Sequence, residues 1–246
     1  MVCLQMVNPK YIITAGCSFT QYPQNPKFSN WPGHLSNYLG CEHNSKFIGK
    51  MSADNSYIAN ITLYTLSSID KNDYDKILLG VMWSGINRMS CFLQEEPDSY
   101  HRFEVEGNPV GYIDKKYYFM SPHWNDELSV IYYKHYYDEI GSIIMSIKNM
   151  LLVQNFCKIN NIKYFFTEYS YDCVSRNILI KHPEVKFLYE QLDKSNFLPV
   201  TDMSDWIDNN TSLSYEPNDR HPTTEMSKQF TENVIIPHLK NMGYVE

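Results

Sequence analysis

The sequence has no block of basic residues: its 21 lysines and arginines are dispersed, and 28 aspartates and glutamates outnumber them, for a formal net charge of −7. A protein that binds nucleic acid neutralises phosphates with clustered lysine and arginine. The sequence therefore predicts no nucleic acid partner. It leaves a small ester or a polysaccharide open as the ligand.

Cysteine is scattered, and no Cys-x-x-Cys pair occurs. The six cysteines are Cys3, Cys17, Cys41, Cys91, Cys157 and Cys173. Structural zinc sites usually use paired cysteines, and disulfide frameworks are typical of much shorter secreted chains. We expect free thiols and a reducing compartment. The histidines other than His221 show no metal-ligand spacing either, so the sequence predicts neither a metal nor another cofactor.

Signals for export and for membrane insertion are absent from the sequence. The first residues lack the basic start and long apolar core of a signal peptide. No run approaches the roughly 18 apolar residues of a membrane span. We therefore expect a cytoplasmic protein without a membrane partner.

Glycine is scarce, with 10 residues, and no glycine-rich phosphate loop follows a predicted strand. This absence disfavours a flavodoxin-like nucleotide-binding protein.

Strand and helix patterns alternate along the chain. Apolar runs predict strands at 10–16, 45–48, 75–83, 162–169 and 197–200, and helical spacing predicts helices at 31–39, 56–69, 132–160, 178–194 and 223–242. The run at 75–83 is apolar throughout, as in a central parallel strand covered on both faces. The pattern predicts one α/β/α sandwich with a mainly parallel sheet. A polar segment, 205–219, precedes the last helix.

Residues 91–130 interrupt this alternation. They combine Glu95–Asp98, a Gly107-Asn108-Pro109 turn and aromatic pieces near Tyr117. We interpret them as an insertion with one or two short hairpins in a single domain spanning residues 1–246. A long insertion after a central strand has two common interpretations. It acts as a lid or specificity element, or it is an additional surface segment without such a role. The sequence leaves both open.

Three polar turns follow the first three predicted strands. Ser18 follows Gly16 at the end of the first, Ser52–Asn55 follow the second, and Ser84–Asn87 follow the third. Parallel strands end at one edge of the sheet, where open α/β sheets bind their ligands. Gly16 permits a sharp turn because it has no Cβ.

An Asp-x-His-Pro pattern stands before the last predicted helix. It contains Asp219 and His221. A serine becomes a nucleophile when a histidine takes its proton, and an acidic neighbour orients that histidine. The alternatives are that His221 caps the helix at the surface and that Asp219 is a turn residue. Together with Ser18, the pattern indicates acyl transfer.

Gly16-Cys17-Ser18-Phe19-Thr20 and Asp219-Arg220-His221-Pro222 resemble the first and last sequence blocks of the SGNH (GDSL-type) serine hydrolases. The resemblance implies a flavodoxin-like sheet of about five strands and a metal-free esterase, lipase or carbohydrate O-deacetylase. It assigns Ser18 as nucleophile, His221 as general base and Asp219 as its partner. The oxyanion donors would be the N–H groups of Ser18 and Ser52 with the side chain of Ser84 or Asn87; Gly16, Gly49 and Asn55 would support the site.

The chain departs from the family pattern at four places. Cys17 replaces the usual Asp. Ser52 falls where a Gly is usual, with Gly49 three residues earlier. The third block lacks Gly-x-Asn-Asp, so either Ser84 replaces the amide or Asn87 reaches back. Asp219 lies two residues before His221 instead of three, with Asn218 at the usual place. Without Asp219 a Ser-His dyad would remain.

We therefore expect a serine esterase that hydrolyses a small acyl ester, with an O-acetylated carbohydrate as the substrate implied by the resemblance. The alternative is a catalytically decayed SGNH fold kept as a structural or carbohydrate-binding module. The resemblance also implies a virion-associated setting if the protein is phage-encoded. The oligomeric state stays open.

Three further features carry paired interpretations. Asn55 contacts substrate or caps the following helix. Arg88 binds an anionic substrate or pairs with an acid of the insertion. The tyrosines at 132–133 and 136–137 form a sugar-stacking platform or are half core and half surface.

Overall fold

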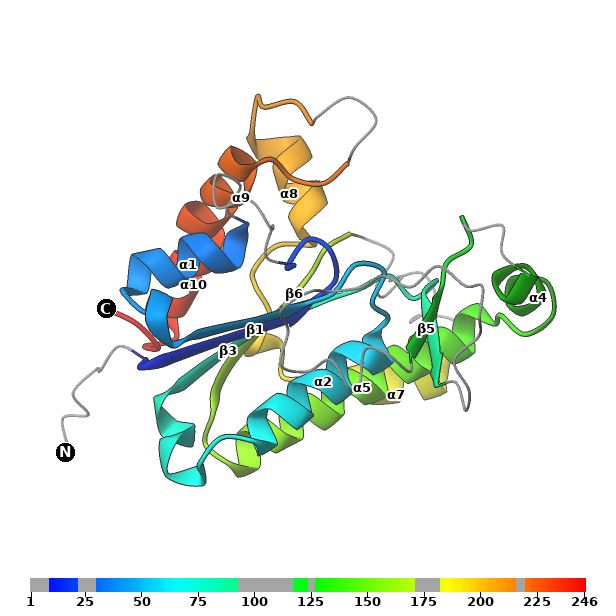
Figure 1. Cartoon of the computed structure of the whole chain (residues 1–246), viewed down its shortest axis with the longest axis horizontal. Helices are drawn as coiled ribbons and strands as arrows, with labels where there is room; N and C mark the ends of the chain where they lie inside the picture. Colours follow the sequence, from blue (N-terminus) through cyan, green and yellow to red (C-terminus); the bar gives the residue numbers. More distant parts are fainter. Residues whose placement is uncertain (1–8, 22–29, 93–116, 124–126, 171–181, 216–219) are drawn as a thin grey trace.

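A computed structural model describes residues 9–21, 30–92, 117–123, 127–170, 182–215 and 220–246. Within these ranges, four parallel strands form a sheet in the order β2-β1-β3-β6 (Figure 1). The strands are β1 (Tyr11–Gly16), β2 (Ser45–Gly49), β3 (Ile77–Trp83) and β6 (Lys163–Glu168). The chain proceeds from β1 to one side and then to the other. Ligands of open α/β sheets bind at the carboxyl ends of the strands beside such a switch point.

Helices cover both faces of this sheet, so the predicted α/β class is confirmed. Figure 1 shows α1 (Trp31–Leu39), α8 (Met203–Asn210), α9 (Thr224–Phe230) and α10 (Ile236–Asn241) on one face, and α2 (Asn55–Ser67), α5 (Glu139–Ile159) and α7 (Pro183–Glu190) on the other. α7 accounts for part of the helix predicted at 178–194; residues 178–181 lie outside the described ranges.

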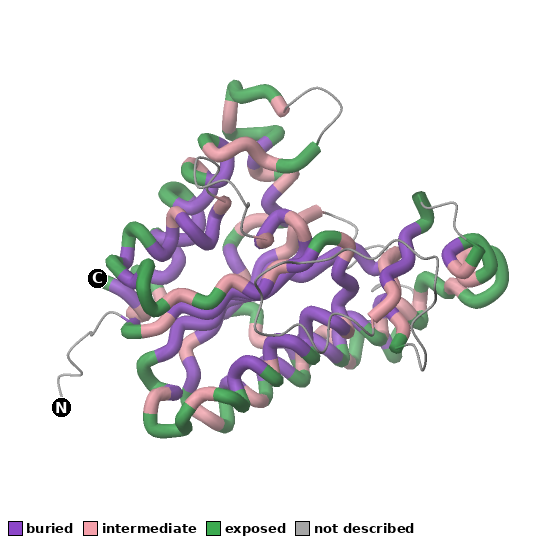
Figure 2. The backbone as a smooth tube through the Cα atoms, viewed as in Figure 1, coloured by how far each residue is buried: buried purple, intermediate pink, exposed green. Residues whose placement is uncertain are grey.

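The two central strands are buried on both faces, which explains their continuous apolar sequence. Successive side chains point to opposite faces. Ile13 and Leu79 therefore pack in the core under α2 and α5, whereas Ile12 and Leu78 pack in the core under α1 and α9. All four side chains are at most 1% exposed. Figure 2 shows this buried layer between the two helical layers.

The fifth strand predicted at 197–200 is wrong. Phe197 forms a single parallel bridge with Phe166, and the N–H of Leu198 donates to the Phe166 carbonyl at 2.9 Å. Pro199 follows directly and has no N–H with which to continue a ladder. The predicted polar segment 205–219 begins within α8, which runs to Asn210.

The single helix predicted at 132–160 is two helices, α4 (Glu127–His135) and α5. The N–H groups of Tyr136 and Tyr137 both donate to the Tyr132 carbonyl, which closes α4. Asp138 then caps α5 by accepting from the Gly141 N–H at 2.7 Å. The apolar spacing continues across this break, so periodicity alone predicted one helix.

Two predicted helix caps are also corrected. Residue type predicts Asn30 or Ser29 as the cap of α1. Asn30 occupies the N-cap position, but its side-chain amide donates to the Gln21 carbonyl and makes no cap hydrogen bond; Ser29 lies outside the described residues. The cap of α2 is Asp54, which accepts from the Tyr57 N–H at 3.0 Å, and not Asn55.

A hairpin follows β3. It consists of the antiparallel strands β4 (Met89–Phe92) and β5 (Tyr117–Met120), so the predicted insertion does contain a hairpin, which begins two residues earlier than expected. The rest of the insertion from 93 to 116 lies outside the described residues. Ser90 of β4 donates its hydroxyl to Asp54 at 2.6 Å and thereby joins the hairpin to α2.

The last predicted helix is interrupted by a π-helical turn. α9 begins after Thr223, whose hydroxyl accepts from the Met226 N–H as predicted for a capping residue. Residues Thr231–Ile235 then form the π turn, and α10 follows. Pro237 lacks an N–H and crowds the carbonyl four residues before it, so the helix widens ahead of it.

By length and hydropathy alone, α5 could span a membrane, the one helix of the described residues that meets this criterion. The expectation that no apolar run approaches a membrane span stays a prediction, because a helix that packs in a protein core meets the same criterion. One face of α5 packs in the core through Ile143, Ile147, Met150 and Val153, all fully buried. That packing accounts for its apolar composition.

Asp54 makes stability depend on pH. Burial raises the pKa of the Asp54 carboxyl above its ordinary value of 3.8, and the hydrogen bonds from Ser90 and Tyr57 lower it by less. The protonated carboxyl is therefore favoured by folding, so its contribution is present at acid pH and is lost as the pH rises through the raised pKa.

We expect the stability of the Asp54→Asn variant relative to wild type to rise with pH, because the amide keeps one acceptor oxygen and cannot ionise. Asp54→Ala, which removes the cap, should cost about 0.5–2 kcal/mol. Urea unfolding of the three proteins between pH 4 and 8 measures both effects. A difference between wild type and Asp54→Asn that is constant across this range would contradict the assignment.

Candidate active site

The turn after β1 carries Ser18. β1 ends at Gly16, and the chain reverses at once, with the Thr20 N–H donating to the Cys17 carbonyl at 3.0 Å. Ser18 lies on this turn and is partly exposed. A Cβ on Gly16 would overlap the Thr20 hydroxyl and lie 2.8 Å from the Met82 carbonyl oxygen. Glycine is thus required here by the close approach of neighbouring atoms.

Gly49, at the end of β2, packs against the same turn. A Cβ on Gly49 would overlap the Gln21 backbone nitrogen and lie 2.5 Å from the Thr20 carbonyl carbon. The next residue, Lys50, donates its N–H to the Gly16 carbonyl at 3.0 Å. The two glycines predicted to support the site therefore hold the first two turns in backbone contact.

His221 meets Ser18 although 203 residues separate them. The distance from His221 Nε2 to Ser18 Oγ is 2.8 Å, a hydrogen bond. His221 is exposed and stands three residues before the start of α9. The contact expected between these two residues is present. Either ring tautomer fits this distance; with Nε2 unprotonated, the serine hydroxyl donates and the imidazole accepts.

A chain of contacts through α1 fixes this meeting. Trp31 Nε1 donates to the Thr20 hydroxyl at 3.3 Å, beside Ser18. The Thr231 hydroxyl donates to the Trp31 carbonyl at 3.4 Å. His34 Nε2 lies 3.2 Å from the Thr224 carbonyl oxygen. The turn that carries Ser18 (the serine turn) and the C-terminal helical segment that begins with α9 (the terminal helix) are thus both hydrogen-bonded to α1.

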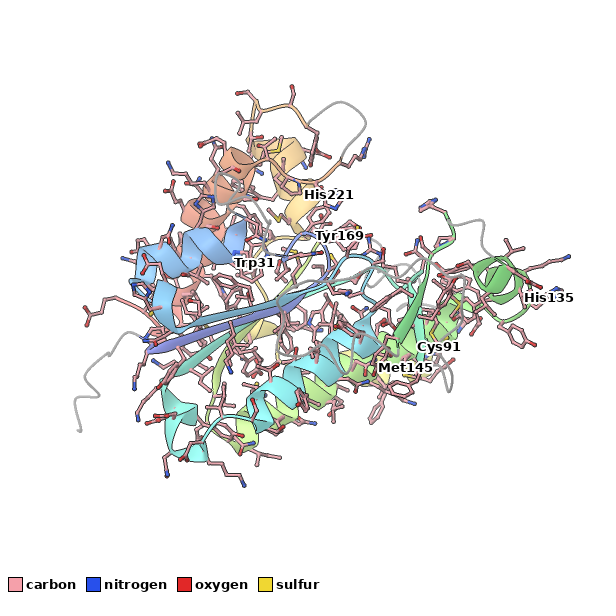
Figure 3. The ribbon with its side chains drawn as sticks, in the orientation of Figure 1. Trp31, Cys91, His135, Met145, Tyr169 and His221 are labelled. Atoms are coloured by element: carbon pink, nitrogen blue, oxygen red, sulfur yellow. The ribbon has the colours of Figure 1, made fainter. Side chains whose placement is uncertain are left out.

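Aromatic rings that the sequence analysis did not single out flank the pair. The Phe19 ring lies 5.2 Å from the His221 ring and 5.0 Å from the Tyr169 ring, centre to centre. Figure 3 shows Tyr169 and His221 near one another, on the side of the sheet that carries α1 and α8. The Arg88 guanidinium lies 5.0 Å from the centre of the Tyr169 ring. The position of Tyr169 directly after β6 was the available signal.

Asp219 and Asn218 lie outside the described residues. The acidic partner predicted for His221 therefore stays a prediction.

Ser52 has an unusual backbone. Its φ is +61°, in the left-handed region that side chains other than glycine's rarely enter. It stands third in a turn closed by the Ala53 N–H donating to the Lys50 carbonyl at 3.2 Å. This is the position that spacing matched to a family glycine, and the backbone here is of the kind glycine favours.

Ser84 and Asn87 belong to the turn after β3. Ser84 is fully buried, and its hydroxyl accepts from Arg88 Nη1 at 2.9 Å. This placement does not present the hydroxyl to a bound ligand. Asn87 is partly exposed, and its Oδ1 lies 2.8 Å from where a Cβ of Gly85 would be. The Tyr169 hydroxyl lies 3.1 Å from the same point, so the side chains of Asn87 and Tyr169 both lie against Gly85.

Asn55 is 4% exposed and so does not face the solvent, which corrects the interpretation that it contacts substrate. Its Oδ1 accepts from the Ser84 N–H at 2.7 Å, and its Nδ2 donates to the Ser84 carbonyl and to Ser146 Oγ, each at 2.9 Å.

The tyrosines considered for sugar stacking differ in exposure. Tyr136 is 72% exposed. Tyr132, Tyr133 and Tyr137 are half-buried and pack on one another, with ring centres 5.0–6.4 Å apart. Burial, aided by the neighbouring tyrosines, raises the pKa of Tyr133. Its hydroxyl donates to the Asn87 carbonyl at 2.5 Å, so it holds the third turn against α4.

The described residues offer no metal site, and their cysteines are not paired. No group of three or more His, Cys, Asp or Glu side chains in the described ranges could hold a metal ion. The four cysteines within those ranges, Cys17, Cys41, Cys91 and Cys157, carry free thiols. Cys17 is fully buried beside Ser18 and behaves as a small core residue.

A model of one protein family matches residues 21–246, nearly the whole chain. The chain belongs to DUF6071. The family is described as a family of unknown function, so membership of DUF6071 assigns no activity. The match to DUF6071 covers His221 and begins three residues after Ser18. A search of curated proteins finds no match to this DUF6071 member.

We expect Gly49→Ala to destabilise the protein by about 2 kcal/mol or more, because backbone atoms of the serine turn cannot move aside cheaply. Gly141→Ala is the control: its nearest atom is the Asp138 carboxylate at 2.9 Å, which caps α5 but stands at the end of a side chain that can shift slightly. That change should stay within about 1 kcal/mol. Equal losses for the two variants in urea unfolding would contradict the close approach at Gly49.

We expect Ser52→Gly to stabilise the protein. Relief of the left-handed strain contributes about 1–2 kcal/mol, and the greater freedom of the unfolded glycine offsets about 0.4–1 kcal/mol. Ser52→Ala keeps the Cβ and should give no gain. A Ser52→Gly variant no more stable than Ser52→Ala in urea unfolding would rule out strain at this position.

Proposed function

We propose that the protein is a serine esterase of the SGNH type, acting through an acyl-enzyme on Ser18. The observation that carries the proposal is the 2.8 Å hydrogen bond between Ser18 Oγ and His221 Nε2. It joins a hydroxyl at the carboxyl edge of a parallel sheet to a base from the far end of the chain. That is the arrangement in which a serine is activated as a nucleophile.

In the proposed reaction, Ser18 Oγ attacks the acyl carbonyl carbon while His221 Nε2 takes the hydroxyl proton. The tetrahedral intermediate collapses when His221 returns this proton to the leaving alcohol oxygen, and an ester of Ser18 remains. A water molecule then attacks the acyl-enzyme and gives its proton to His221. His221 then gives this proton to Ser18 Oγ as the second tetrahedral intermediate collapses, which releases the carboxylic acid and restores the Ser18 hydroxyl. Asp219 is proposed to orient the imidazole and to stabilise it when protonated.

The developing oxyanion needs preorganised donors. We assign the N–H groups of Ser18 and Ser52 and the side-chain amide of Asn87. The left-handed backbone of Ser52 supports the second assignment, because a turn of this kind matches the family's glycine. For the third, the partial exposure of Asn87 and the burial of Ser84, whose hydroxyl accepts from Arg88, favour Asn87 over Ser84.

The fold is consistent with this assignment. The order β2-β1-β3-β6 corresponds to the first four strands of the flavodoxin-like order, whose ligands bind at the switch between β1 and β3. Ser18 follows β1, and the turn with Asn87 follows β3. We propose a small acyl ester as substrate, with an O-acetylated carbohydrate as the natural class; this choice rests on analogy with the SGNH family.

We expect the protein to hydrolyse p-nitrophenyl acetate and Ser18→Ala to lose at least about a thousandfold in kcat, because no other group supplies the nucleophile. His221→Gln should lose a similar factor. Ser67→Ala and His43→Gln, two changes at exposed positions outside the site, are the matched controls and should keep wild-type rates.

Thermal unfolding of each variant establishes that it is folded. If wild type and Ser18→Ala hydrolyse the ester equally slowly, the esterase proposal fails. The alternative, a decayed SGNH fold serving as a structural or carbohydrate-binding module, would then be preferred.

A further inference from the structure

β3 extends beyond β1 at the carboxyl edge of the sheet. The last pair between these strands is Ala15 with Val81, whereas β3 remains paired with β6 as far as Trp83. β1 then turns away at Gly16. On the β1 side, Ser84 therefore has no strand with which to pair, although its N–H and C=O are buried and need partners.

Asn55 takes the place of the missing strand. Its amide accepts from the Ser84 N–H at 2.7 Å and donates to the Ser84 carbonyl at 2.9 Å, the two bonds that a neighbouring strand would make. The second N–H of the amide donates to Ser146 Oγ of α5 at 2.9 Å. Both N–H groups and the oxygen are thus engaged, which fixes the orientation of the amide.

The residues that Asn55 joins carry the proposed oxyanion donors. Ser52 lies three residues before Asn55, in the turn that leads into α2. Asn87 lies three residues after Ser84, in the turn that follows β3. This buried side chain therefore joins the second and third turns of the site directly, beside the bond from Ser90 to Asp54. The contact with Ser146 adds a third point of attachment, on the helical layer.

We propose that Asn55 is a positioning residue, which holds the turns of Ser52 and Asn87 in register with Ser18 without touching the substrate. This inference rests on the proposed esterase function. Displacement of reacting groups by about 1 Å can lower a rate about a hundredfold. Loss of the amide should therefore lower the rate of acyl transfer more than it weakens substrate binding.

The test is Asn55→Asp, which keeps the shape and the oxygen that accepts from the Ser84 N–H. When the introduced carboxyl is ionised, which an assay at pH 8 favours, it replaces the donor to the Ser84 carbonyl by an oxygen, so that two acceptors face each other. The matched control is Asn149→Asp, on the same α2–α5 interface. Asn149 donates to Ser56 Oγ at 3.0 Å, and that hydroxyl can rotate to donate instead. Each protein is assayed with p-nitrophenyl acetate, and reactive Ser18 is counted with a fluorophosphonate.

The expected result is a kcat per reactive Ser18 that falls about 10- to 100-fold in Asn55→Asp, with KM within about twofold and Asn149→Asp near wild type. An unchanged kcat, or a raised KM alone, overturns the inference and leaves the esterase standing. A wild type without turnover dependent on Ser18 overturns both.

A second variant keeps the test decisive if Asn55→Asp does not fold. Asn55→Ser removes both contacts with Ser84 and leaves room for water, and it should show the same loss of kcat. If neither variant folds while Asn149→Asp does, Asn55 is a folding determinant and its role in positioning is overturned.

Discussion

Backbone contact between two glycines and one turn underlies the whole arrangement. Gly16 and Gly49 end adjacent strands, and each lies so close to Thr20 that a methyl group would collide with it. This contact presses the serine turn against the edge of the sheet. Because interiors are densely packed and deform little, the turn has one position. The backbone of Ser18 is thereby held at the edge of the sheet.

A second set of contacts positions His221 next to Ser18. α1 is hydrogen-bonded to the serine turn through the indole of Trp31. It is hydrogen-bonded to the terminal helix through Thr231, which donates to the Trp31 carbonyl, and through His34. The terminal helix is itself fixed at its start by the Thr223 cap. His221 stands two residues before this cap, so its position follows from the helix that it precedes. Few of these contacts are strong alone, but together they bring two distant residues within 2.8 Å.

Much of this organisation could be predicted from the sequence. The uninterrupted apolar run of β3 marks a strand covered on both faces, and Gly-Cys-Ser after β1 marks a turn at the sheet edge. The pairing of Ser18 with His221 followed from their places beside a strand end and a helix start. The glycine contacts could not be predicted, because they depend on which atoms other strands bring near.

The errors of the sequence analysis have physical causes. The helical spacing of the apolar residues in 132–160 gives no sign of the cap at Asp138, so the two helices were predicted as one. A fifth strand was predicted without weighing Pro199, which stops the ladder after a single bridge. Asn55 is of a residue type favoured at helix caps. That its amide bonds Ser84 in place of a strand can be seen only in the structure, where β1 ends before β3 does.

The separation of Ser18 from His221 along the chain also has a consequence for folding. All four strands of the parallel sheet precede His221, so during synthesis Ser18 leaves the ribosome long before His221 does. Domains emerge from their N-terminal side, and a nascent chain that has completed the sheet still holds Ser18 as an ordinary alcohol. Docking of the terminal helix is therefore the step that completes the hydrogen bond between Ser18 and His221, on which the proposed activity rests.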